Sequence, residues 1–155
     1  MSTELERIEE QLRRAFERDA WHGPSVLETL QGITATQAHA HPIVGAHSIW
    51  EVVLHLSATY GLVLRRLRGE GAQLSAAEDW PLVPPATEAS WQEAVGALRR
   101  HNAELRDAVR AFPADRLDQP LVPDPPYTAY TQFIGITQHD LYHAGQISLL
   151  KRALG

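Results

Sequence analysis

Two histidines separated by one helical turn are the residues of this sequence best suited to chemistry. The segment His139-Asp-Leu-Tyr-His143 places them four positions apart. On an α-helix this spacing stacks both imidazoles on one face, where they can reach a single ion. A pair of hydrogen-bonded core histidines is the competing interpretation, because a His-x-x-x-His pair alone is a weak signal for metal binding. A third ligand would decide between the two.

His55 is the best candidate for the third ligand. It lies midway along a predicted helix, on the flank of the apolar stripe and in line with Ser48, Glu51 and Thr59. This position is typical of a side chain that faces a polar pocket between helices, although a surface histidine can also occupy it. Most of the remaining histidines fall at helix ends or in loops, where histidine needs no special explanation. We therefore leave out His22, His39, His41, His47 and His101.

Three further residues near these histidines are weighed as catalytic groups. Tyr142, predicted near the inward face, is a weak candidate that could donate a hydrogen bond to a reacting oxygen, with packing as the alternative. Glu51 is another weak candidate, but a capping partnership with Ser48 explains it more simply. Asp140 could orient a ligand or act as the base of a metalloprotease-like motif, yet aspartate is one methylene shorter than the glutamate of that motif. Solvent exposure or a salt bridge is its expected state.

The predicted site has the ligand count of a catalytic metal centre. Three neutral imidazoles leave a divalent ion with an open position, at which the ion would lower the pKa of a water or a thiol. This predicts hydrolysis or thiol transfer. Zinc and nickel are the favoured ions, and iron and manganese remain open because imidazole suits several metals. The alternative is a structural site, or a binding module for a metal or small molecule that performs no catalysis.

The elements that must position these residues are helices. Ser or Thr followed three residues later by Glu or Gln predicts helix starts, at Thr3/Glu6, Ser25/Glu28, Thr34/Gln37, Ser48/Glu51 and Ser90/Glu93. Apolar residues of helical period predict four long helices, over residues 5–16, 49–67, 91–109 and 131–152. No strand pattern competes with them. The predicted fold class is all-α, a four-helix bundle.

The connections between these helices differ in character. Residues 24–42 predict a short helix or helical turns, and Gly69 and Gly71 are expected to stop the second long helix. Half of the ten prolines lie between Pro113 and Pro126, which predicts a long, stiff, non-helical connection before the last helix. Such a connection either walls a site or is a spacer that lets the last helix reach its place.

Composition limits the class of protein. A chain of 155 residues predicts one domain over 1–155. A net charge of -5, with no stripe of basic residues, argues against nucleic acid as a partner. The absence of cysteine excludes disulfides, thiolate ligands and a cysteine nucleophile. No apolar run reaches the length of a membrane span, so we expect no membrane partner and a cytoplasmic location.

Two stretches of the sequence resemble the DinB/YfiT-like superfamily. They are His47-Ser-Ile-Trp-Glu-Val-Val-Leu-His55-Leu and His139-Asp-Leu-Tyr-His143-Ala-Gly-Gln-Ile147. The length and the layout of four helices agree as well. The resemblance implies a four-helix bundle in which one histidine of the second long helix and two of the last bind a divalent metal. These correspond to His55, His139 and His143.

The same resemblance implies a range of activities. Members of this bacterial family include metal-dependent transferases and isomerases that use low-molecular-weight thiols such as bacillithiol or mycothiol. Many members are homodimers. We therefore expect a thiol S-transferase that acts on a small-molecule substrate and forms a homodimer. The damage-inducible expression that gives the family its name says nothing about binding DNA.

Overall fold

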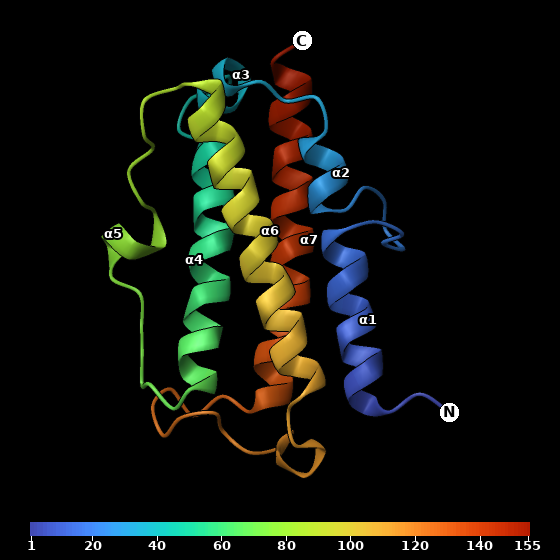
Figure 1. Ribbon diagram of the computed structural model, residues 1–155. Coiled ribbons are helices and arrows are strands. Elements are labelled where there is room, and N and C mark those ends of the chain that lie inside the picture. The colour runs from blue at the N-terminus through green and yellow to red at the C-terminus, as the bar shows by residue number, and fades with distance from the viewer.

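Four long helices form the body of the molecule. The computed structural model describes residues 1–155 and contains seven α-helices and one 3-10 turn, with no strand. The long helices lie side by side as a bundle (Figure 1), and they are α1 (Glu4–Phe16), α4 (Ile49–Leu67), α6 (Glu88–Arg110) and α7 (Ala129–Ala153). The all-α fold predicted from the apolar periodicity is thereby confirmed. None of the helices combines the length and the apolar character needed to cross a bilayer.

Side-chain caps fix where most helices begin. Four of the predicted capping boxes are present, at Thr3, Ser25, Thr34 and Ser48. The predicted box of Ser90 and Glu93 is wrong, because the hydroxyl of Thr87 accepts a hydrogen bond of 3.1 Å from the Ser90 N–H. Helix α6 therefore begins one turn earlier, and Ser90 lies inside it. A box that the sequence analysis overlooked, formed by Ser75 and Glu78, starts a short helix.

Helix direction dictates the course of the connection between α4 and α6. These two helices run the same way along the bundle, whereas α1 and α7 run the opposite way (Figure 1). Residues 68–87, here called the crossover segment, must therefore return along the whole length of α4. Near its start lies Gly69, whose φ of +87° turns the chain away from the end of α4. It carries the short helix α5 (Ala76–Asp79).

Of the other two connections, the first packs partly against the side of α7 and the second stays at one end of the bundle. Helices α2 (Val26–Leu30) and α3 (Ala35–His39) join α1 to α4, as the predicted helical turns of 24–42 require. Residues 111–128, here called the proline-rich connection, join α6 to α7 at the opposite end (Figure 1). The connection is non-helical, as predicted, except for the 3-10 turn Ala114–Arg116.

Large aromatic side chains fill the core between the helices. Trp50 of α4 and Trp91 of α6 lie 5.2 Å apart between ring centroids, and both are buried. The indole N–H of Trp91 donates a 2.9 Å hydrogen bond to the carbonyl of Ile33, so its one polar atom is satisfied. Phe16 of α1 meets Tyr60 of α4 edge to face at 6.0 Å. This packing holds α4 rigidly beside its neighbours, and α4 carries one of the predicted ligands.

Candidate metal centre

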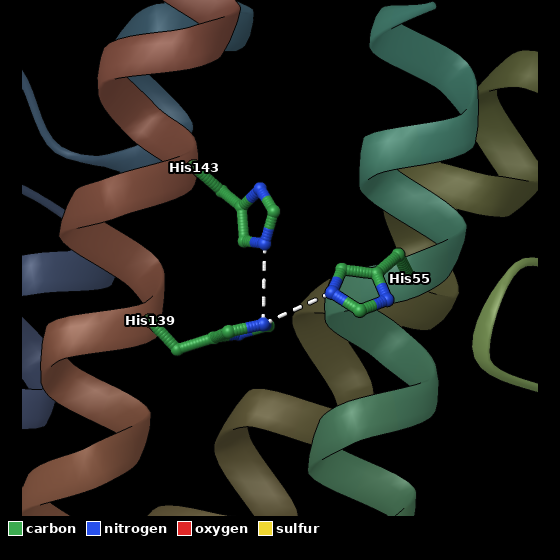
Figure 2. A group of neighbouring side chains, drawn as sticks. All are labelled: His55, His139 and His143. Atoms are coloured by element: carbon green, nitrogen blue, oxygen red, sulfur yellow. Dashed lines mark hydrogen bonds between the residues drawn. The ribbon is translucent and has the colours of Figure 1, made fainter. Parts of the chain in front are cut away.

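Three imidazoles from two helices converge on one point. His55 projects from the middle of α4, and His139 and His143 project toward it from α7 (Figure 2). The Nε2 atom of His139 lies 3.0 Å from Nε2 of His55 and 3.1 Å from Nε2 of His143. One nitrogen from each ring lies within 4.8 Å of the other two, a spacing at which the three could hold one metal ion. The structure thus brings together the three histidines singled out from the sequence.

Hydrogen bonds on the far side of two rings fix which nitrogen carries the proton. Nδ1 of His55 lies 2.9 Å from the carbonyl oxygen of Asp79 and 3.0 Å from a carboxylate oxygen of the same residue. Nδ1 of His143 lies 2.6 Å from the amide oxygen of Gln146. These oxygens only accept, so each Nδ1 must donate. Each Nε2 is then left with a lone pair that points at the shared space.

The meeting of the three Nε2 atoms is unfavourable without a cation. His55 and His143 both present lone pairs to His139, and a neutral His139 has one ring proton. At most one of the two short contacts can therefore be a hydrogen bond, and the other sets lone pair against lone pair. Nδ1 of His139 is also buried without a partner. A divalent ion shared by the three nitrogens removes the conflict, so these residues fit the metal that the donor set suggests.

Burial keeps the two α7 histidines in the form that binds metals. Desolvation lowers the pKa of His139 to about 3, and the neighbouring His143 and His55 add to the effect. Desolvation also lowers the pKa of His143 to about 4, against the opposing effect of the hydrogen bond that His143 donates to Gln146. Both rings are therefore neutral at pH 7. A metal ion does not have to displace a proton from either of them.

A tryptophan that the sequence analysis overlooked closes one side of the site. The ring of Trp80 stacks on His55 with a centroid separation of 4.1 Å and an interplanar angle of 3°. Its other face stacks on His47 at 3.6 Å and 6°. His47 is thus held by packing rather than aimed at the cluster, which agrees with leaving it out. The Ser75-x-x-Glu78 pattern signals a helix at this point, but no local pattern reveals that the helix docks beside His55.

Asp140 and Tyr142 lie where the sequence analysis did not expect them. Asp140 is fully buried and accepts a 2.6 Å hydrogen bond from the Tyr60 hydroxyl. Burial raises the pKa of Asp140 to about 8, so the expected exposed or salt-bridged carboxylate is wrong. Its contact with Tyr60 in the core also removes it as the base of a metalloprotease-like site. Tyr142 is 66% exposed, and only the edge of its ring contacts His143.

Glu51 performs the capping role that was preferred for it. Its carboxylate accepts a 2.6 Å hydrogen bond from the backbone N–H of Ser48, and the Ser48 hydroxyl accepts one from the N–H of Glu51. The same carboxylate lies 2.9 Å from Nε2 of His41. These partners account for its lowered pKa, which they bring about against the opposing effect of burial. A catalytic role for Glu51 or Tyr142 stays a prediction.

The proline-rich connection does not wall the site. The residues outside the cluster that hydrogen-bond to the three rings or make ring contacts with them belong to the crossover segment and to α7, and none lies between residues 111 and 128. Instead the connection packs on the ends of α6 and α7, where Phe112 and Phe133 meet edge to face at 5.4 Å. The spacer interpretation of this connection is therefore the better one.

A largely apolar cavity of about 310 Å³ lies beside the cluster. It is lined by Ile43, Gly45, Ala46, His47, Val52, Gln146, Leu149 and Leu150. Two of these residues also belong to the surroundings of the cluster, because Gln146 accepts from His143 and His47 stacks on Trp80. None of the three imidazoles lines the cavity itself, but through Gln146 and His47 it borders the surroundings of the cluster and offers room there for the hydrocarbon part of a small molecule.

Comparison with known proteins identifies the family from most of the chain. The model of the DinB superfamily matches residues 9–147, a span that includes all four long helices except the ends of α1 and α7. No curated protein and no solved structure gives a match.

Proposed function

Because the chain belongs to the DinB superfamily, we propose that it is a metal-dependent enzyme whose divalent ion, zinc or nickel, is held by His55, His139 and His143. The convergence of three Nε2 atoms, with protons held on the far side of two rings, is the observation that carries the proposal. Three protein ligands are typical of catalytic rather than structural zinc sites.

The proposed reaction is the transfer of a low-molecular-weight thiol to a small electrophile. A bound divalent ion supplies Lewis-acid activation, which favours the anionic form of a thiol or a water at neutral pH. The chain has no cysteine, so the nucleophilic sulfur must come from a second substrate. The apolar cavity beside the cluster supports an electrophile with a hydrocarbon part.

Residues of this chain would prepare the site for that reaction. Asp79 and Gln146 hold protons on the outer nitrogens of two rings, which leaves the inner lone pairs free for the ion. Trp80 covers His55 and excludes water from that side. We expect the protein to act as a homodimer. That expectation comes from the family resemblance and stays a prediction.

Turnover with defined thiols tests the proposal. Zinc-loaded or nickel-loaded protein is incubated with bacillithiol, mycothiol or glutathione and a panel of electrophiles, and the loss of free thiol is measured. We expect consumption that requires the metal and is abolished in His143→Ala. Metal-dependent loss of the electrophile without loss of thiol would assign a hydrolase instead. Metal binding that raises the melting temperature without any turnover would assign a binding module.

A further inference from the structure

Two consecutive residues of the crossover segment hold one of the proposed ligands. Asp79 and Trp80 lie at the end of α5, where the segment passes the middle of α4. Asp79 meets the edge of the His55 ring and Trp80 meets its face. No other side chain outside the histidine cluster makes a hydrogen bond or a stacking contact with this ring. The orientation of His55 therefore depends on a segment that is distant from it in the sequence.

The contact of Asp79 is directed at a single ring atom. Both its backbone carbonyl and its carboxylate lie within 3.0 Å of Nδ1 of His55, so one N–H is shared between two acceptors of the same residue. In metal sites, an acceptor on the outer nitrogen fixes the tautomer and the ring orientation, and a carboxylate there makes the imidazole a stronger ligand. The side chain of Asp79 is 38% exposed, so its charge is kept at the edge of the bundle.

The contact of Trp80 is directed at the plane of the ring. The indole lies between two imidazoles, 3.6 Å from His47 and 4.1 Å from His55, with all three rings nearly parallel. Rotation of the His55 ring would break this stack on one face. Because His47 lies on the opposite face of the indole, Trp80 cannot tilt to follow such a rotation. The plane in which the Nε2 lone pair lies is thereby fixed.

The crossover segment is itself anchored close to these contacts. The Ser75 and Glu78 capping box starts α5 one turn before Asp79. Glu78 also lies 3.7 Å from the guanidinium of Arg65, a residue of α4. These links keep the end of α5 against α4. Helix direction explains why the segment is available for this role, since it must travel alongside α4 to reach the start of α6.

We propose that Asp79 and Trp80 are positioning residues of the metal centre, which orient His55 so that its Nε2 shares an ion with His139 and His143. The proposal rests on the proposed function, because it requires that the three histidines bind a metal. It assigns the crossover segment a role in the metal centre, namely the orientation of His55. Occupancy of the site and docking of this segment then stabilise one another.

The test measures how tightly each variant binds Zn²⁺ alone and how it coordinates Co²⁺. Affinity is measured by competition with a chromophoric chelator, and coordination by the visible absorption bands of the Co²⁺-loaded protein. Asp79→Ala should weaken Zn²⁺ binding by about 10-fold, the lower end of the usual range for such partners, because the backbone acceptor stays. Trp80→Leu should give a similar loss, and the double variant a loss of about 100-fold.

Conservative and control variants separate positioning from general damage. Asp79→Asn keeps an acceptor oxygen and Trp80→Phe keeps a stacking ring, so both should recover part of the lost affinity and the wild-type Co²⁺ spectrum. Leu82, in the same segment, is 96% exposed, and Leu82→Ala should bind as the wild type does. Circular dichroism of the metal-free proteins identifies any variant that fails to fold. In that case the partly exposed Asp79 still provides the test through Asp79→Asn.

Each result separates this inference from the proposal on which it rests. Wild-type affinity and an unchanged Co²⁺ spectrum in both Asp79→Ala and Trp80→Leu would overturn the inference and leave the metal site intact. A wild-type protein that binds neither ion would overturn both. Weaker Zn²⁺ binding and altered Co²⁺ bands in these two variants, relative to the wild type, would support the positioning role if Leu82→Ala shows neither change.

Discussion

Two of the connections in this molecule, the proline-rich connection and the crossover segment, differ in whether they reach the three imidazoles, and their compositions do not show which one does. The proline-rich connection, residues 111–128, is stiffened by proline, yet it stays at one end of the bundle (Figure 1) and makes no hydrogen bond or ring contact with the three imidazoles. The crossover segment, residues 68–87, has no such signature, yet it places Asp79 and Trp80 on His55. What distinguishes them is the direction of the helices that they join.

Helix direction decides which connection can reach the middle of the bundle. The antiparallel helices α6 and α7 are joined at one end, so the connection between them has no reason to pass a site at mid-height. Parallel neighbours such as α4 and α6 require a return along the full length of the bundle (Figure 1). In a helical bundle, a connection between parallel helices is therefore the first place to look for groups that support a central site.

Exchange of each connection for a flexible linker should give the largest difference. Replacing residues 76–82 by a Gly/Ser sequence of equal length removes both contacts to His55, so Zn²⁺ affinity should fall by about 100-fold. The same replacement of residues 120–126 should leave the affinity unchanged. Chelator competition measures both. Equal losses from the two replacements would erase the distinction between the connections.

Truncation of a buried side chain should show that the proline-rich connection serves stability. Leu117 is 7% exposed and belongs to the core, so Leu117→Ala should lower the free energy of unfolding of the metal-free protein by about 2 kcal/mol. Zn²⁺ affinity should not change. Urea denaturation measures the first quantity, and Leu82→Ala in the crossover segment is the matched control with no expected effect. A loss of affinity in Leu117→Ala without unfolding would contradict the spacer role.

Removal of the helix cap in the crossover segment should give a smaller effect, and this effect should be on Zn²⁺ affinity. Ser75→Ala deletes the cap of α5 at a cost of about 1 kcal/mol. Because α5 ends at Asp79, a loosened segment should reduce Zn²⁺ affinity by up to about 5-fold, the equilibrium equivalent of that cost. Thr34→Ala, which deletes a similar cap from α3, should leave the affinity unchanged. A larger effect of Thr34→Ala on affinity would show that the crossover segment has no special link to the site.

The pH dependence of stability should be insensitive to the proline-rich connection. The lowered pKa values of His139 and His143, about 3 and 4, stabilise the metal-free fold above pH 6.5, and this contribution is lost as the pH falls from 6.5 toward these values. Asp140 acts in the opposite sense. Its pKa is raised from 3.8 to about 8, so its contribution is complete below pH 3.8 and is lost as the pH rises through 8.

An Asp140→Asn background separates these two slopes. In that background, stability should rise from about pH 4.5 to pH 6.5 and then level off, because carboxylates with lowered pKa values, such as Glu10 and Glu51, add a slope only below pH 4.5 and the histidine contribution accounts for the slope above it. Replacement of residues 120–126 should shift this curve without changing its slope. Urea denaturation across the pH range measures both. If the slope disappears when residues 120–126 are replaced, the pKa values of His139 and His143 depend on the proline-rich connection, which contradicts the prediction.

Much of the fold follows from local patterns. Caps such as Ser48 and apolar stripes such as that of α4 depend on residues within one or two helical turns, so they can be predicted from the sequence. The placement of His139 and His143 on one helix face can be predicted for the same reason. Their meeting with His55 is a tertiary contact, and two signals predict it: the position of His55 on the flank of its helix and the resemblance of its motif to a known family.

Other features of the site depend on packing that no local pattern encodes. Asp140 stands next to His139, and its burial against Tyr60 results from the neighbouring helix rather than from its own segment. Tyr142 faces solvent because one step around the helix from His143 leaves the interface. The stack of Trp80 on His55 joins residues 25 positions apart through the course of a connection. Such contacts follow from topology, which the sequence patterns leave open.

Metal content of the purified protein is the most direct test of the central claim that three imidazoles share one ion. Elemental analysis of the wild type should give about one equivalent of divalent metal per chain. His55→Ala and His143→Ala should each lose most of it, although the first lies on α4 and the second on α7. A wild type without metal, or stoichiometric metal in both variants, would contradict the account.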